Sequence, residues 1–234
     1  MRKLSFLFII VLALVLTTTA QTVRQSFEEG TRAASNAEYG RALANYRKAI
    51  LYTENEKIGD DFRARIHFNA GVCLFQMKQN AEAVAEFNQA IALSNRGYQK
   101  AFYVLGMAQA KLKNWLKAES AFREAVNLKK DDGEAWFDLG LVLLEEKDFP
   151  AAEKAFQNSI RYKTVAASDA HNNIGVIYAM KGNFVAAEKE FETALRESKG
   201  ESSLARNNLE FCKSYKQNFS GDLSAKLEFG RDKE

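Results

Sequence analysis

The chain has 234 residues, of which 47% are hydrophobic and only one is proline. This composition suits a single elongated α-helical domain. The formal net charge of +3 is far from the strongly basic balance that nucleic-acid binding usually needs, so we expect no nucleic-acid partner.

Residues 1–20 have the features of a secretory signal peptide. Arg2 and Lys3 precede an unbroken apolar run over residues 6–16, and small residues then offer a cleavage site. The alternative is an uncleaved membrane anchor, but eleven apolar residues are short against the ~20 that span a bilayer. We therefore expect a mature chain that begins at Gln21, has no membrane-inserted segment, and is exported to the periplasm or the extracellular space.

Five glycines mark a repeating unit along the rest of the chain. In each copy a small residue follows the glycine at offset 12, an aromatic residue at offset 16 and a second small residue at offset 19. Successive glycines lie 41, 35, 34 and 35 residues apart, which identifies a repeat protein. The glycines are Gly30, Gly71, Gly106, Gly140 and Gly175.

Each copy is predicted to form two antiparallel helices. Apolar residues such as Phe102 and Leu105 precede the glycine at helical spacing, and the glycine lets a neighbouring helix come close. About eight residues later, Asn114, Asp148 and Asn183 are expected to cap the second helix of their copies. One face of that helix carries the small, aromatic and small residues, so each copy needs its neighbours to bury its apolar face.

These residues resemble the tetratricopeptide repeat, whose pattern has an aromatic residue, Leu-Gly, another aromatic residue, and then Ala, Phe and Ala. The resemblance covers residues 23–201 and implies an all-α fold, a right-handed superhelical solenoid of antiparallel helix pairs. Polar Ser26 and Glu29 in the first copy fit a terminal repeat with no predecessor. Within a solenoid over 21–201, the five repeats are expected at residues 23–56, 64–97, 99–132, 133–166 and 168–201.

Residues 202–219 are predicted to form a helix that caps the stack. The sequence around Leu209 echoes the sequence around Ile174 at an offset of 35, but Glu210 takes the place of the repeat glycine and no second helix follows. Residues 220–234 are charged and have no sustained period, so we expect them to be disordered.

The sequence holds no strong pattern for catalysis, a cofactor or a metal. His67 and His171 occupy equivalent positions three repeats apart, so we expect packing roles rather than metal binding or general-base catalysis. Cys73 and Cys212 are separated by four repeat steps, which is too far for a disulfide, and are expected to be buried free thiols. Phosphate loops, zinc-spaced sets and nucleophile elbows are absent from the sequence. We therefore expect a protein that is not an enzyme.

A stripe on the first helix of each repeat is the candidate binding surface. It joins residues six and three before the glycine with residues one and four after it, and in tetratricopeptide proteins it lines a groove that binds peptides or protein segments. An exposed apolar stripe indicates a partner site, but curvature of the stack would instead let neighbouring repeats cover it as core. The candidate residues are Arg24, Phe27, Arg65, Phe68, Asn69, Val72, Lys100, Tyr103, Met107, Phe137, Leu141, Asn172 and Val176.

Asn69 and Lys100 also match two positions of a family variant that clamps a C-terminal carboxylate. Phe27, Thr31 and Val104 occupy the other three positions, so the clamp is incomplete.

The sequence as a whole predicts a non-enzymatic scaffold that binds a protein or peptide partner in a bacterial cell envelope, by analogy with exported repeat proteins. The alternative is an envelope enzyme or a glycan-binding subunit. Titratable groups converging in one pocket would favour the enzyme. Polar and aromatic residues without an apolar channel would favour the glycan-binding subunit.

Overall fold

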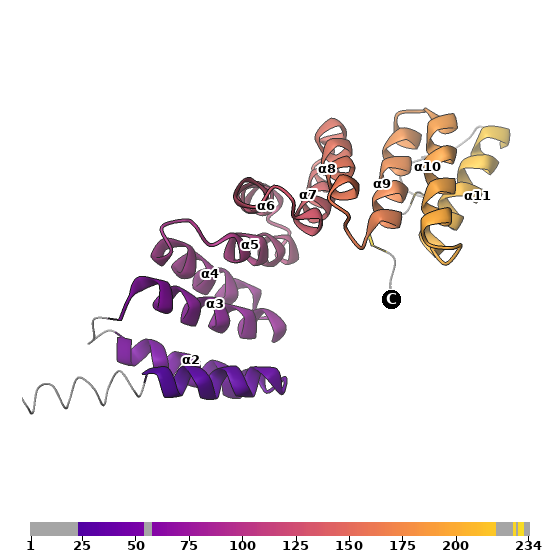
Figure 1. Cartoon of the computed structure of the whole chain (residues 1–234). Coiled ribbons are helices and arrows are strands. Elements are labelled where there is room, and N and C mark those ends of the chain that lie inside the picture. The colour runs from indigo at the N-terminus through magenta and orange to yellow at the C-terminus, as the bar shows by residue number, and fades with distance from the viewer. Residues whose placement is uncertain (1–22, 54–57, 219–226, 228, 232–234) are drawn as a thin grey trace, which may run out of the picture. The chain divides into compact units, whose positions relative to one another are not determined.

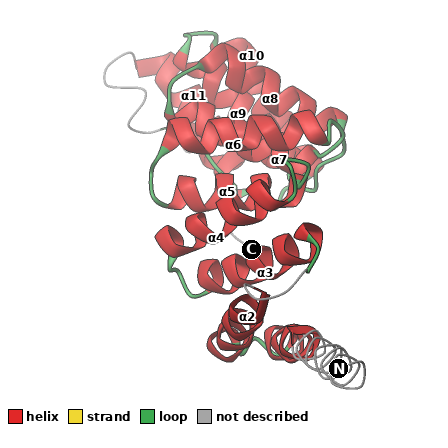
Figure 2. Cartoon of the chain, turned by 90° about the vertical axis from the view of Figure 1, so that its left-hand side faces the viewer, coloured by secondary structure: helices red, strands yellow, loops and turns green. Residues whose placement is uncertain are grey.

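The computed structural model describes residues 23–53, 58–218, 227 and 229–231. Every regular element in this part of the chain is an α-helix (Figures 1 and 2), which confirms the all-α prediction. None of these helices has the length and apolar character that crossing a membrane requires. The expected signal peptide and Gln21 lie outside the described residues.

The helices form two compact units, Met1–Asn114 and Trp115–Glu234. The first unit contains a helix over residues 23–35, followed by α2 (Tyr39–Thr53), α3 (Asp60–Gln76), α4 (Asn80–Leu93) and α5 (Gln99–Lys111). The second contains α6 (Trp115–Leu128), α7 (Gly133–Glu145), α8 (Phe149–Arg161), α9 (Ala167–Met180), α10 (Phe184–Glu197) and α11 (Ser203–Asn218). The division falls between the two helices of the third predicted repeat.

Within each unit, helices pack in the order of the chain. In the first unit α3 contacts α2, α4 and α5, and α4 contacts α5. In the second, each helix from α6 to α11 contacts the next, and α9 also contacts α11. Two pairs of first helices from neighbouring repeats are therefore in contact, α3 with α5 and α9 with α11, as in the predicted solenoid of helix pairs.

The repeat glycines make room for the aromatic ring of their own repeat. A Cβ atom added to Gly140 would lie 2.6 Å from the Phe156 ring, and one added to Gly175 would lie 2.6 Å from the Phe191 ring. Both rings are 0% exposed and cannot move away freely. The same relation joins Gly30 to Tyr46 and Gly71 to Phe87. In each of these repeats, the glycine of the first helix and the aromatic ring of the second helix therefore contact each other directly.

Two of the three predicted caps are present as helix N-caps. The Asp148 carboxylate accepts a hydrogen bond from the backbone N–H of Ala151 at 3.2 Å, and the Asn183 side chain accepts one from the third residue after it at 3.2 Å. The Asn114 side chain donates a hydrogen bond to Gln109 Oε1 at 2.9 Å. These side chains fix where the second helix of a repeat begins.

The two histidines join the helices of their own repeats. His67 Nδ1 lies 2.7 Å from Glu86 Oε2, and His171 Nδ1 lies 2.7 Å from Glu190 Oε2. In each case the histidine is on the first helix and the glutamate is on the second. The matching geometry in two repeats fits the structural role predicted for both histidines.

Both cysteines are free and buried. Cys212 Sγ lies 3.8 Å from the backbone carbonyl oxygen of Phe184, which suits a weak S–H donor. Burial raises the pKa of the Cys73 thiol to about 11, so the reactive thiolate is scarce at neutral pH. Both residues therefore serve as packing groups in their units.

The described residues of the C-terminal segment, which the sequence analysis expected to be disordered, contact helices of the second unit. Leu227 is 7% exposed and lies in an apolar cluster with Val176 and Leu209. Gly230 hydrogen-bonds to a side chain of α9, and Arg231 forms an ion pair with α7. Residues that dock through single side chains and the backbone leave no periodic pattern in the sequence.

Candidate functional site

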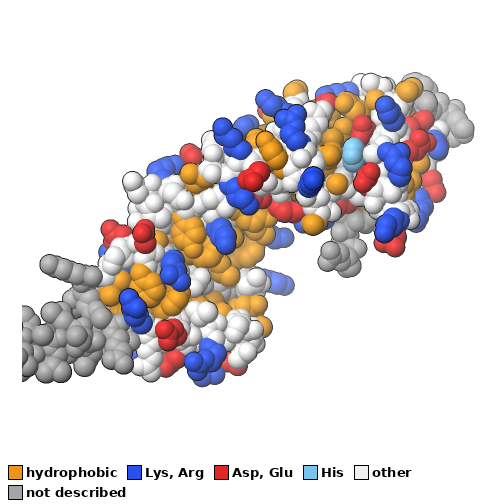
Figure 3. Space-filling model, viewed as in Figure 1, with side chains coloured by type: hydrophobic (Ala, Val, Ile, Leu, Met, Phe, Trp, Pro, Cys, Tyr) orange, Lys and Arg blue, Asp and Glu red, His pale blue; other side chains and the backbone are white. Residues whose placement is uncertain are grey.

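In the first unit, the predicted stripe includes a cluster of aromatic rings. The centroids of Phe27 and Phe62 are 5.0 Å apart, and those of Phe68 and Tyr98 are 4.9 Å apart. The Arg65 guanidinium lies 5.4 Å from the Phe27 ring and 5.7 Å from the Phe62 ring. Apolar side chains gather over α3 to α5 among lysines and arginines on the face shown in Figure 3. This surface therefore combines apolar contact area with positive charge.

The stripe residues of the first unit differ in exposure. Arg24, Arg65 and Lys100 are exposed, whereas Phe27 is only 9% exposed and belongs to the core. The stripe is thus neither an open groove nor a fully covered core in this unit. The half-buried members are Phe68, Asn69, Val72, Tyr103 and Met107.

A cavity of about 340 Å³ lies beside this cluster, at the start of α3 and the loop before α5. Burial raises the pKa of the Tyr98 hydroxyl, and the charge of Arg65 only partly opposes this effect. The phenol therefore stays protonated near neutral pH and keeps its hydrogen-bond donor. The lining residues are Asp61, Ala64, Arg65, Ser94, Gly97 and Tyr98.

In the second unit, most of the predicted stripe is covered. Phe137 and Asn172 are 0% exposed and Val176 is 1% exposed, while Leu141 is half-buried. The ring of Phe137 packs against Phe156, with centroids 5.6 Å apart. Three of these four stripe residues are therefore covered in this unit, and the C-terminal segment supplies part of the cover through Leu227 beside Val176 and Arg231 over Phe137.

The C-terminal segment is bound through the side-chain amide of Asn173. Asn173 Oδ1 accepts a hydrogen bond from the Gly230 N–H at 2.8 Å, and Asn173 Nδ2 donates one to the Gly230 carbonyl at 3.1 Å. Two further amides extend this contact inward. Asn208 Nδ2 donates to Asn172 Oδ1 at 2.8 Å, and Asn172 Nδ2 donates to Asn173 Oδ1 at 3.4 Å. All three asparagines are buried, so the network fixes the amide that meets Gly230.

Arg231 is held by α7 through its charge and its planar face. Its Nη2 donates to Glu134 Oε2 at 2.8 Å and lies 3.8 Å from Asp138 Oδ1, and the guanidinium is 4.7 Å from the centroid of the Phe137 ring. Burial acts to raise the pKa of Glu134, but hydrogen bonds from Thr164 and Arg231 and the Arg231 charge outweigh burial and lower that pKa. The carboxylate is therefore ionised near neutral pH, as an arginine partner requires.

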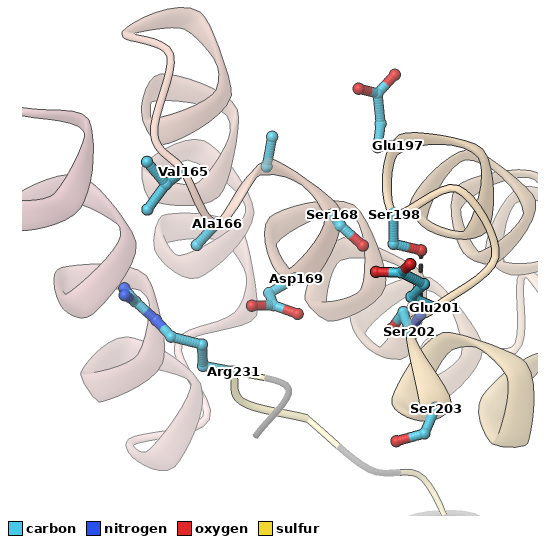
Figure 4. A pocket seen from close by; sticks show the side chains of 11 residues that line it. Val165, Ala166, Ser168, Asp169, Glu197, Ser198, Glu201, Ser202, Ser203 and Arg231 are labelled. Atoms are coloured by element: carbon cyan, nitrogen blue, oxygen red, sulfur yellow. Dashed lines mark hydrogen bonds between the residues drawn. The ribbon is translucent and has the colours of Figure 1, made fainter. Parts of the chain in front are cut away.

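A cavity of about 580 Å³ lies beside Arg231. Figure 4 shows it bordered by the loop before α9 and by the turn between α10 and α11, with Arg231 of the C-terminal segment at one side. Asp169, Glu197 and Glu201 give its lining an acidic character. Among the described residues, no group of His, Cys, Asp or Glu side chains is arranged to hold a metal ion.

The sequence analysis missed the side chains of α7 and α9 that contact the C-terminal segment. Glu134 lies on the stripe, six residues before Gly140, but was not selected. Asn173 lies two residues before its repeat glycine, in the position that Asn69 holds in the second repeat. The doublet Asn172-Asn173, repeated 35 residues later as Asn207-Asn208, was the available signal.

Comparison with known proteins agrees with the helix-pair architecture. A family model for the tetratricopeptide repeat matches residues 27–98, 79–135, 103–161 and 137–202. No curated protein matches the sequence.

Several solved structures share the fold. A MamA structure has a TM-score of 0.69 at 19% identity, covering 87% of this chain and 98% of MamA. MamA from Desulfovibrio magneticus RS-1 gives 0.68 at 16% identity, covering 78% of this chain and 98% of the other. YrrB, described as a TPR protein with an unusual peptide-binding site, gives 0.66 at 25% identity, covering 82% and 90%. Since the family model matches more than half of the sequence, and α3 packs with α4, α7 with α8 and α9 with α10, the chain belongs to the tetratricopeptide repeat family.

Proposed function

We propose that the chain is a non-enzymatic scaffold that binds a peptide or protein segment along the first helices of its repeats. Tetratricopeptide repeat proteins are interaction modules, and the observation that carries the more specific proposal is on α9. There Asn173 binds the backbone of an extended segment through both hydrogen-bonding groups of Gly230. A first helix of this chain is therefore suited to hold a peptide by its main chain.

The first unit offers an equivalent position on a more open surface. Asn69 on α3 occupies the place of Asn173 in its repeat, and it is half-buried beside half-buried Phe68. Exposed Arg65 and Lys100 add positive charge to the same stripe. The similarity to YrrB, a TPR protein described as having a peptide-binding site, supports the proposal. The partner best suited to the first unit is an extended segment with apolar and acidic side chains.

Phe68→Ala and Tyr103→Ala are each expected to weaken partner binding by roughly 1–2 kcal/mol or more, because aromatic side chains dominate such interfaces. Their effect on unfolding free energy should be about 1 kcal/mol or less, since both residues are only half-buried. The partner is first captured from the native envelope fraction with the wild-type chain. Titration calorimetry then measures the affinity of each variant, and thermal melts measure its stability.

Leu51→Ala is the matched control for these substitutions, because Leu51 is 60% exposed on α2, the second helix of its repeat. It should change neither affinity nor melting temperature. Should Tyr103→Ala lower the melting temperature as far as Phe87→Ala, which empties a fully buried site in the same unit, the stripe is core and the binding assignment is wrong.

We also propose that the chain is exported and loses residues 1–20 on the way. The charged start and the short apolar run of the sequence support this step. Mass spectrometry of the protein recovered from the cells that make it should find a first residue of Gln21 in the soluble envelope or extracellular fraction. Recovery of intact Met1 in the membrane pellet would contradict export with cleavage.

A further inference from the structure

The described part of the C-terminal segment meets the second unit at three separate points. Leu227 enters the apolar cluster formed by Val176, Leu209 and Cys212, and is 7% exposed. Gly230 is bound by Asn173, and Arg231 lies on α7. Phe229 is 40% exposed, so the larger of the two apolar side chains faces solvent. The segment therefore docks through the contacts of Leu227, Gly230 and Arg231, and not by burying its largest apolar side chain.

The Gly230 position selects its residue by backbone conformation. Its φ is +129°, a value that L-residues rarely adopt, and a Cβ added there would meet no atom within 4 Å. Space therefore does not exclude a side chain, but L-chirality does. The mirror image of this φ, about −129°, lies in the β region of L-residues, so the φ itself is an ordinary one for a D-residue.

The Arg231 position combines three features that favour arginine over lysine. The guanidinium lies over the face of Phe137, donates to Glu134, and has Asp138 as a second carboxylate within 4 Å. A planar group can stack on the ring and donate sideways to a carboxylate at the same time, whereas an ammonium group cannot stack in this way.

The receptor side of the contact is fixed by the fold. Asn173 is oriented by the buried amides of Asn172 and Asn208, which belong to α9 and α11. Glu134 is held by a hydrogen bond from Thr164 Oγ1 at 2.5 Å. Groups fixed before binding lose little conformational entropy when a ligand arrives, which favours a specific site over an incidental contact.

We propose that the surface formed by α7, α9 and α11 is a specific site for an extended peptide with the pattern aliphatic–x–x–Gly–Arg, and that the chain's own Leu227 and Phe229–Arg231 are its resident ligand. This inference rests on the proposed peptide-binding function, but it concerns the second unit and the sequence that this unit selects. Any other segment of this pattern must displace the resident one.

Competition within the chain predicts how strongly the site is masked. A tethered ligand is present at an effective concentration on the order of millimolar. An added peptide of the same sequence therefore binds the wild-type chain much more weakly than it binds a chain whose own segment is disabled. We expect a difference of at least about tenfold in the apparent Kd.

The test uses a fluorescent synthetic peptide spanning residues 224–234 and the full chain. The double variant Leu227→Ser/Arg231→Ala disables the resident segment and leaves every residue of α6 to α11 unchanged. Anisotropy titrations should give an apparent Kd at least about tenfold lower for this double variant than for wild type. Arg161→Ala, an exposed arginine at the end of α8, is the matched control and should bind the peptide as weakly as wild type.

Variant peptides test the selected pattern without disturbing the receptor. In the double-variant chain, D-Ala in place of Gly230 should bind like the parent peptide, whereas L-Ala should bind about tenfold more weakly because its backbone is strained. Lysine in place of Arg231 should also weaken binding severalfold. Asp138→Asn in the same chain should weaken the arginine peptide more than a peptide with alanine there.

Three results would overturn the inference. Equal affinity of the wild-type and double-variant chains, or no binding to either, would mean that the segment is not a competing ligand. Equal affinities of the D-Ala and L-Ala peptides would remove the selection at Gly230. A wild-type dimer in light scattering that dissociates on Leu227→Ser/Arg231→Ala would place the segment on a second copy instead. If the peptide does not bind but Phe68→Ala still weakens partner binding, the inference about the second unit is wrong and the proposed function of the first unit stands.

Discussion

Phe156→Ala is expected to lower the free energy of unfolding by about 3–5 kcal/mol, as removal of a fully buried ring does. The Phe156 ring is 0% exposed, fills the space left by Gly140, and packs against Phe137. Because glycine has no side chain, the repeat cannot close the cavity from the opposite side. Denaturant unfolding monitored by circular dichroism gives the measurement.

Phe229→Ala is the matched control, because it removes the same ring from the same unit at a position that is 40% exposed. We expect it to cost about 1 kcal/mol or less. If the two substitutions were equally destabilising, the ring column of the repeats would not be the main source of packing energy in this unit.

The pairing of helices could be predicted because the contact within a repeat joins two positions that recur in every copy. A glycine without a side chain and an aromatic ring sixteen residues later are complementary, and the structure places them in contact in Gly71 with Phe87 and again in Gly140 with Phe156. Repetition of the same pair makes the signal stronger than any single residue could.

The turns inside the repeats could be predicted only in part. The position before the cap is left-handed, with φ of 62° at Lys147 and 76° at Gly182. Only the copy with Gly182 has a glycine at this position, which is the usual sequence signal for a left-handed turn residue. Lysine also takes this position in the copies with Lys78 and Lys113, whose φ values are 62° and 57°. The packing of the two helices and the cap that follows determine the backbone there, overriding the preference of the residue.

The exposure of the candidate binding stripe was the least predictable feature, because exposure depends on what packs over a helix face. Phe68 and Phe137 occupy the same position in their repeats, three residues before the glycine, yet Phe68 is half-buried and Phe137 is 0% exposed. Part of the cover on Phe137 is the Arg231 guanidinium, from a segment nearly a hundred residues away along the chain. Sequence period indicates which residues share a face but not which distant segment covers that face.

Gly175→Ala is expected to lower the free energy of unfolding by about 1–3 kcal/mol through overpacking, although alanine is favoured over glycine inside a helix by about 1 kcal/mol. The added Cβ would lie 2.6 Å from one ring atom of Phe191 and 2.7 Å from the next. Combining the change with Phe191→Leu removes the ring edge that the Cβ meets. The double variant should then lose less unfolding free energy than the two single variants lose together, with a coupling free energy of about 1 kcal/mol or more.

Gly40→Ala provides the control for helix propensity, because Gly40 lies in α2 and a Cβ there would meet nothing within 4 Å. This substitution should stabilise the chain by about 0.5–1 kcal/mol. Opposite signs for Gly40→Ala and Gly175→Ala in chemical denaturation would show that the repeat glycine is required by the Phe191 ring. If both glycine substitutions stabilised the chain, and Gly175→Ala showed no coupling to Phe191→Leu, then contact with the ring would not be the reason for glycine at this position.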